Sequence, residues 1–118
     1  MTTILIKRVY EPAGEKDGFR ILVDRLWPRG MKKETANLDK WMKEVAPENA
    51  LRKWFNHEPE KWVSFRQKYK AALKKTDAVQ ELIAEIKKHK RVTFLYSAKD
   101  ETHNQAVVLQ EYIRQLLG

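Results

Sequence analysis

Two segments near the start of the chain show the apolar runs that predict strands. The first is TILIKRVY, residues 3–10, and the second is FRILVDRL, residues 19–26. Between them lies EPAGEKDG, whose glycine, proline and charged residues favour a turn. Because this link is too short to hold a crossover helix, we expect the two strands to be antiparallel if they are neighbours in one sheet.

The middle of the chain changes to helical spacing, which predicts two helices between residues 33 and 55. In the first, with Thr35 or Asn37 as its N-cap, apolar residues recur at intervals of three and four, at Leu38, Trp41, Met42 and Val45. The second begins at Pro47 and is short, with its apolar positions at Leu51, Trp54 and Phe55.

Two further helices follow before the next strand. One begins near Pro59, with lysines on one face and an apolar stripe on the other, formed by Trp62, Phe65, Tyr69 and Leu73. The other opens with Asp77 and Gln80, which are spaced as a capping box, and its apolar stripe is Val79, Leu82, Ile83 and Ile86. Its last turn is rich in lysine, which suits the negative end of a helix dipole.

The chain ends with a strand, a polar loop and a last helix. The strand is VTFLY, residues 92–96, and the loop is SAKDETHNQ, residues 97–105, where Thr102 and Gln105 form a second capping box. The inward residues of the last helix are Ala106, Leu109, Ile113 and Leu116. The sequence therefore predicts the α/β class, with a short mixed or parallel sheet of about three strands flanked by about five helices.

The size and composition of the chain favour one compact unit. A chain of 118 residues is expected to form a single domain, residues 1–118, around one hydrophobic core. It contains no cysteine, which excludes disulfides, thiolate metal sites and cysteine nucleophiles. The apolar run at the N-terminus is too short for a signal peptide or a membrane span. We therefore expect a cytoplasmic protein that does not enter a membrane.

The net charge of +8 is concentrated in the second half of the chain. Residues 1–60 hold 12 Lys and Arg against 10 Asp and Glu, whereas residues 61–118 hold 12 against 6. Such a charge attracts phosphorylated metabolites or nucleic acid, although a solvated helix face gives the same pattern. The six basic residues of the 61–75 helix are the candidate phosphate contacts, namely Lys61, Arg66, Lys68, Lys70, Lys74 and Lys75.

Chemically useful side chains gather where two predicted strands end. In open α/β sheets, ligands bind beyond the carboxyl ends of the strands, next to helix N-termini. The segment VDRLWPRG, residues 23–30, and the 97–105 loop both follow strands. If the two strands run parallel to each other, we expect their side chains to converge on one cationic pocket, with Asp24, Asp100 and His103 as the candidate catalytic groups. The candidate ligand-binding residues are Arg25, Trp27, Arg29, His57, Ser97, Lys99 and Asn104.

Each of these residues also has a purely structural interpretation. Asp100 and Thr102 are suited to capping the last helix. Asp24 can form an ion pair with Arg25 or Arg29. His57, close to a helix start, can satisfy local backbone groups, and the Trp27-Pro28 turn can pack on the core.

Several kinds of site are disfavoured by the spacing of residues. The three histidines lack helical metal-ligand spacing, so we expect no metal site, although Asp24, Asp100, His57 and His103 are able to meet in principle. Ser97 has His103 as a nearby base but lacks a nucleophile elbow. No glycine lies between Gly30 and Gly118, which argues against a phosphate loop or a dinucleotide fold. No cofactor is identified.

Three segments together resemble a known family. DGFRILVDRLWPRG, LRKWFNHEPEKWVSFRQKY and VTFLYSAKDETHNQAVVLQEYI are similar to the YeaO-like proteins of domain of unknown function 488, a resemblance that extends from Lys7 to about Ile113. It implies a small bacterial or archaeal α/β protein and carries over no activity and no catalytic residues. Some members of the wider family contain cysteines, but this chain has none, so a cysteine-based mechanism is ruled out here.

Two function classes agree best with these observations. The first is an enzyme or ligand-binding protein for a small phosphorylated or otherwise anionic molecule, in which Arg25, Arg29 and Lys99 hold the anion. The second is a nucleic-acid-binding module that uses the 61–75 helix, for which Trp62 or Tyr69 must be exposed to stack on bases. A protein-interaction domain anchored by Trp27 is a third alternative.

Overall fold

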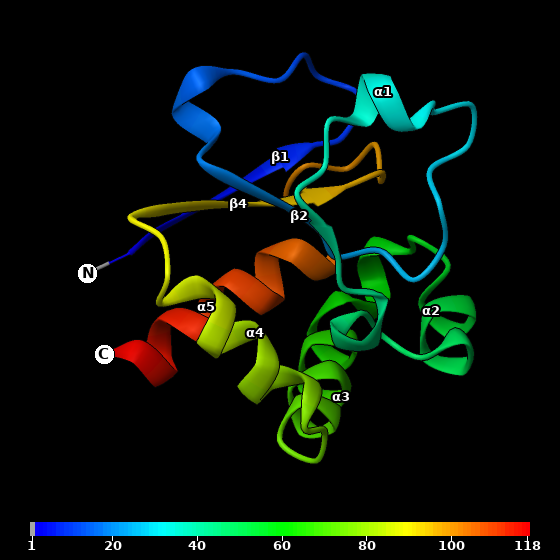
Figure 1. The fold of residues 1–118 in the computed structure, drawn as a ribbon. Helices are drawn as coiled ribbons and strands as arrows, with labels where there is room; N and C mark the ends of the chain where they lie inside the picture. Colours follow the sequence, from blue (N-terminus) through cyan, green and yellow to red (C-terminus); the bar gives the residue numbers. More distant parts are fainter. Residues whose placement is uncertain (1) are drawn as a thin grey trace.

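A four-stranded parallel sheet forms the centre of the structure, a computed structural model that describes residues 2–118 (Figure 1). The strands are β1 (Thr3–Arg8), β2 (Phe19–Leu22), β3 (Lys40–Trp41) and β4 (Arg91–Tyr96). Their order is β1-β4-β2-β3, so the last strand in the chain lies between the first two. This confirms the α/β class and adds a short edge strand to the three predicted from sequence.

The first two strands are parallel to β4 and do not pair with each other. Ile4 of β1 pairs with Val92, and Phe19 of β2 pairs with the same residue from the other side. The antiparallel hairpin expected for neighbouring strands is therefore not formed. The link between them crosses one face of the sheet and contains a single 3₁₀ turn, η1 (Glu15–Asp17).

Five α-helices and three 3₁₀ turns surround the sheet. The helices are α1 (Lys33–Ala36), α2 (Asn49–Phe55), α3 (Trp62–Leu73), α4 (Ala78–Ile86) and α5 (Gln105–Leu117). The other two 3₁₀ turns are η2 (Lys43–Val45) and η3 (Pro59–Lys61). Helices α3, α4 and α5 lie on one side of the sheet, and α1 lies on the other with the β1–β2 link (Figure 1).

The prediction of a helix around residues 38–45 is wrong. Asn37 takes a left-handed conformation with φ 49°, which ends α1 after one turn. The chain then pairs with β2, where the N–H of Asp39 donates to the carbonyl of Arg20 at 2.9 Å and that of Met42 donates to Leu22 at 3.0 Å. The helical spacing arose because these residues face different layers: Met42 and Val45 lie in the main core, whereas Leu38 packs on the opposite face of the sheet. Hydrogen bonds to the edge of the sheet outweighed the local periodicity.

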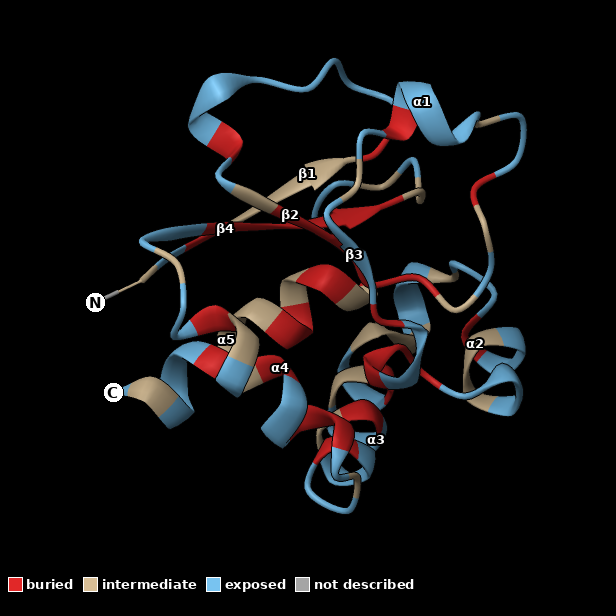
Figure 2. Cartoon of the chain, viewed as in Figure 1, coloured by how far each residue is buried: buried red, intermediate tan, exposed pale blue. Residues whose placement is uncertain are grey.

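The two faces of the sheet contribute to two different apolar clusters. On the helical face, Ile21, Phe94 and Tyr96 join the main core with residues of α3, α4 and α5. On the opposite face, Leu22 and Leu95 form a small apolar cluster with Val9 and Ala36. Strand β4 is buried on both faces after its first residue, which explains why its sequence is apolar there except for Thr93 (Figure 2).

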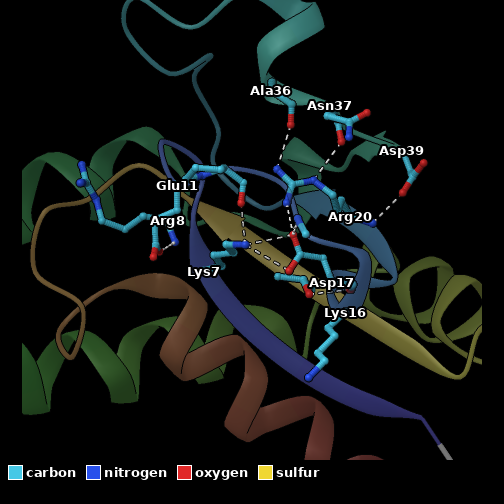
Figure 3. A network of polar contacts seen from close by, with 12 residues as sticks. Lys7, Arg8, Glu11, Lys16, Asp17, Arg20, Ala36, Asn37 and Asp39 are labelled. Carbon is cyan, nitrogen blue, oxygen red and sulfur yellow. Dashed lines mark hydrogen bonds and ion pairs between the residues drawn. The ribbon is translucent and has the colours of Figure 1, made fainter.

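The second face also carries a buried polar network. The carboxylate of Asp17 accepts hydrogen bonds from Lys7 and Arg20, and the Arg20 guanidinium also donates to the carbonyls of Ala36 and Asn37, at 2.9 Å each (Figure 3). Burial acts to raise the pKa of Asp17, but hydrogen bonds from Gly14, Lys7 and Arg20 outweigh it and lower this pKa. The network thus fastens the β1–β2 link and α1 to the sheet.

The predicted helix caps were only partly correct. Asp77 does precede α4, but its side chain makes no capping hydrogen bond, and the Thr76 hydroxyl accepts from the N–H of Ala78 instead. Helix α5 begins with Asn104 as its N-cap, whose side chain accepts from the N–H of Val107 at 3.2 Å. The capping box expected from Thr102 and Gln105 is therefore not formed, and Gln105 is the first residue of the helix.

Candidate functional site

Asp24 and Ser97 meet where β2 and β4 end. The Asp24 side chain is buried, and one of its carboxylate oxygens accepts the N–H and the hydroxyl of Ser97, at 3.0 and 2.6 Å. The other oxygen accepts from the side-chain amide of Gln105, at the start of α5. Because β2 and β4 are parallel neighbours, their carboxyl ends lie side by side and bring these residues together.

The surroundings of Asp24 change its acidity. Burial raises the pKa of this carboxyl group, and the hydrogen bonds from Ser97 and Gln105 and the nearby His57 offset that rise only in part. Within residues 2–118 Asp24 forms no ion pair, so the predicted pairing with Arg25 or Arg29 does not occur. Both carboxylate oxygens are held by neutral donors.

A cavity of about 330 Å³ opens beside this carboxylate. The segment after β2 contributes residues 24–29, α2 contributes Arg52 and Phe55, and the following turn contributes His57. The remaining lining residues come from four other parts of the chain and are Ala46, Pro47, Phe65, Ser97, Ala98 and Gln105. Six residues predicted as site residues therefore share this cavity, namely Asp24, Arg25, Trp27, Arg29, His57 and Ser97.

Two arginines of the segment after β2 have different surroundings. The Nε and Nη2 groups of Arg25 donate to the carbonyls of Pro47 and Ala46, each at 3.0 Å, and so fix one wall of the cavity. Arg29 is exposed, and within residues 2–118 its guanidinium has no hydrogen-bond or ion-pair partner. Arg25 thus positions the wall, whereas Arg29 is free to contact a ligand.

Arg52 and Gln105 line the cavity but were not identified from the sequence. Gln105 begins the helix after the 97–104 loop, and side chains in the first turn of such a helix face the carboxyl edge of the sheet. Arg52 lies three residues before Phe55, so both occupy the same face of α2. That spacing was the available indication for Arg52.

His57 stands at the cavity in a strained backbone conformation. It follows Asn56, the C-cap of α2, and the two residues have φ values of 55° and 47°. Two successive non-glycine residues in the left-handed region are unusual, and such strain clusters at functional sites. The imidazole is exposed, and its centroid lies 6.1 Å from that of the Phe55 ring.

The other predicted residues of the 97–105 loop do not line the cavity. Lys99 is exposed, and Asn104 is used as the cap of α5. The Asp100 carboxylate lies 3.0 Å from His103 Nδ1 and accepts the N–H of Thr102 at 3.0 Å. These bonds lower the pKa of Asp100 to about 2, mainly through the backbone N–H of Thr102. Lys99 and His103 were expected to converge with Asp24, but they do not share the cavity lining with it.

The basic face of α3 is largely occupied by its own contacts. Arg66 and Lys70 pair with Glu111 at 2.6 and 3.3 Å, and Lys61 pairs with Glu58 at 2.9 Å. The ammonium groups of Lys61 and Lys68 lie 5.1 and 4.9 Å from the Trp54 ring centroid. Tyr69 is buried and Trp62 is partly buried, so neither presents the open face that stacking on bases requires. Lys74 and Lys75 are exposed.

The described part of the chain has neither a metal-binding cluster nor a helix able to cross a membrane. Residues 2–118 contain no group of three His, Cys, Asp or Glu residues placed to hold a metal ion. No helix within the same range has both the length and the apolar character that crossing a membrane requires.

Comparison with known proteins places the chain in a family. Residues 3–118 match a family model described as the inactive DUF488-N3 subclade. The Escherichia coli protein titled "Uncharacterized protein YeaO" is 48% identical over 113 residues, which cover 96% of this chain and 98% of that protein. Two proteins titled "Uncharacterized protein", Mb3100c of Mycobacterium bovis and Rv3073c of Mycobacterium tuberculosis, are each 41% identical over 81 residues, or 69% of either chain. No solved structure gives a significant match. The chain therefore belongs to the YeaO-like proteins of the DUF488 family.

Proposed function

We propose that the cavity at the carboxyl ends of β2 and β4 binds a small anionic molecule. The observation that carries this proposal is the imbalance of charge around it. Three arginines and His57 line the cavity, whereas Asp24 is its only acidic residue. Because both oxygens of Asp24 accept hydrogen bonds from Ser97 and Gln105, this carboxylate is poorly placed to compete for the cationic groups.

We further propose that the protein binds this molecule without transforming it. The description of the matched family model, an inactive subclade, favours binding over turnover. The side chains favour it too, because the Ser97 hydroxyl donates to Asp24 and the histidine of the same loop, His103, pairs with Asp100. Within residues 2–118 no histidine or lysine nitrogen is hydrogen-bonded to the Ser97 hydroxyl, and the carboxylate that it does contact is a weak base for activating a serine nucleophile.

A titration against small anions tests the binding proposal. Phosphate, sulfate, succinate and glucose 6-phosphate would each be titrated into the purified protein by calorimetry, at low and at moderate salt. An anion present at about 100 times its dissociation constant is also expected to raise the free energy of unfolding by about 2.7 kcal/mol, which a thermal shift detects.

Two variants assign the binding to the cavity. Arg29→Ala removes one charge-assisted hydrogen-bond donor and is expected to weaken binding by about tenfold to hundredfold. Lys75→Ala removes the same charge from an exposed position that does not line the cavity, and should bind like the unmodified protein. Equal loss of affinity in both variants, or no binding of any anion in the series, would reject the proposal.

A further inference from the structure

We infer that the ligand of this cavity is an aromatic oxyanion, and that Arg52 is a second arginine that binds its charged group. This inference rests on the proposed function and specifies its ligand class. Two independent features carry it. One is a buried donor on Arg52 without a partner, and the other is the apolar part of the cavity lining.

Arg52 shares unused hydrogen-bonding capacity with Arg29 in the cavity lining, and unlike Arg29 it is partly buried. Its Nε is buried and has no partner among residues 2–118, and its Nη2 reaches only the side chain of Asn49, at 3.4 Å. No other buried side-chain nitrogen or oxygen within residues 2–118 lacks a partner. An unpaired buried donor of a charged group is costly, so its persistence calls for a partner that the protein itself does not supply.

Two other arginines near the strand ends, Arg8 and Arg25, contrast with Arg52. Arg8 donates to the carbonyls of Ala98 and Ser97 at 2.8 and 3.1 Å, and Arg25 donates to two carbonyls of the 46–47 segment. These guanidinium groups fasten backbone around the site. A planar guanidinium without such bonds matches the two oxygens of a carboxylate or a phosphate, and Arg29 supplies a second one.

The apolar part of the lining is equally specific. Eight of the fifteen lining residues are apolar, and the aromatic ones are Trp27, Phe55 and Phe65. The indole N–H of Trp27 donates to the carbonyl of Met31 at 2.7 Å, and the ring packs edge-on against Trp41 with centroids 5.5 Å apart. Trp27 is therefore fixed in place with its polar group satisfied, and its contribution to the cavity is apolar surface.

The volume restricts the ligand further. At about 330 Å³, the cavity lies at the lower end of the range for small-molecule sites, which is about 300 to 1,000 Å³. One aromatic ring with a carboxylate or a phosphate fits such a space, whereas a dinucleotide does not. A bare inorganic anion leaves the apolar wall uncovered, so it lacks the binding energy that burying a ring provides.

Calorimetric titration with matched probes tests the ligand class. Phenylphosphonate and methylphosphonate carry the same charged group with and without a ring, benzoate replaces the phosphonate by a carboxylate, and benzyl alcohol keeps the ring without charge. We expect phenylphosphonate to bind about tenfold to hundredfold more tightly than methylphosphonate, since a ring becomes buried. Benzyl alcohol should bind more weakly than either aromatic anion. Comparison of benzoate with phenylphosphonate distinguishes a carboxylate ligand from a phosphate ligand.

Variants test which residues bind the charged group and which bind the ring. Arg52→Gln should weaken both phosphonates by about tenfold or more while leaving their ratio unchanged. Trp27→Leu should reduce the ratio of the phenylphosphonate affinity to the methylphosphonate affinity. Leu26→Ala changes the same apolar wall at an exposed lining position and keeps the hydrogen bond from Trp27 to Met31. Arg66→Gln is the control, because Arg66 pairs with Glu111 and does not line the cavity. Thermal unfolding of each variant shows that it is folded.

The outcomes separate this inference from the proposed function. If methylphosphonate binds at the cavity as tightly as phenylphosphonate, the aromatic class is wrong while the anion site stands. If Arg52→Gln binds both probes like the unmodified protein, the role of Arg52 is wrong. If no small anion binds at all, the proposed function itself fails.

Discussion

Ser97 donates both its backbone N–H and its hydroxyl to one oxygen of Asp24, at 3.0 and 2.6 Å. The two residues are 73 positions apart in the chain but follow strands that are neighbours in the sheet. Their contact joins two segments that both line the cavity. It also fixes a buried carboxylate at a position where its charge affects both stability and ligand binding.

Asp24→Asn is expected to change how stability depends on pH. The pKa of Asp24 is raised in the folded protein, so ionising it costs more there than in the unfolded chain. Its contribution to stability is complete below the unfolded pKa of about 3.8 and decreases as pH rises through the folded pKa. As pH rises above about 4, the free energy of unfolding of Asp24→Asn should therefore increase relative to that of the unmodified protein.

Urea unfolding of both proteins between pH 3 and pH 8 measures this difference. Ser97→Ala serves as a comparison, because it keeps the carboxyl group and removes the 2.6 Å hydrogen bond that favours its ionised form. Relative to the unmodified protein, this variant should therefore lose stability as pH rises above about 4. Parallel curves for Asp24→Asn and the unmodified protein would mean that Asp24 has the same pKa in both states.

His57→Gly is expected to reduce ligand binding without loss of stability. Glycine adopts the left-handed conformation at φ 55° without the cost of about 1 to 2 kcal/mol that other residues pay. It also removes the imidazole from the cavity lining. The melting temperature should stay equal or rise, whereas anion affinity should fall. His57→Val is the control in the opposite direction, because a β-branched residue is strained at this φ and should lower the melting temperature. A Val variant as stable as the unmodified protein would show that the backbone at this position is not strained.

Arg20→Ala is expected to destabilise the fold by about 3 kcal/mol. The change leaves Asp17 without its buried guanidinium partner and the carbonyls of Ala36 and Asn37 without their donor. Arg66→Ala, which breaks the partly exposed pair with Glu111, should cost at most about 1 kcal/mol. Denaturant unfolding compares the two. Similar small losses in both variants would show that the network of Figure 3 adds little.

Gly18→Ala is expected to be far more damaging than Gly14→Ala. Gly18 has φ 67°, and a Cβ added there would lie 2.3 Å from the carbonyl oxygen of Arg91. Overpacking of this kind, together with the left-handed conformation, costs at least about 1 to 3 kcal/mol. At Gly14 the nearest contact is 3.7 Å and φ is −127°, so alanine fits. Thermal unfolding of the two variants gives the comparison, and equal stabilities would contradict the close approach of β2 and β4.

The sequence by itself determined the elements whose pattern is local and repeated. The apolar stripe of α4 has side chains that face one core, and the largely apolar run of β4 has side chains buried on both faces of the sheet, so both patterns are visible without the fold. The same reasoning identified Asp24 and Ser97 as strand-end residues, since every strand of a parallel sheet ends at the same edge.

Only the tertiary structure decided which strands are neighbours and which side chains meet. The place of β4 between β1 and β2 depends on pairing across more than 70 residues, about which local propensity carries no information. The edge strand β3 formed because hydrogen bonds to β2 outweighed a helical spacing. Arg25 donates to the carbonyls of residues 46 and 47, and Arg52 lines the cavity, because α2 and the segment before it fold beside the strand ends. Such contacts arise from packing in three dimensions, and a one-dimensional pattern does not encode them.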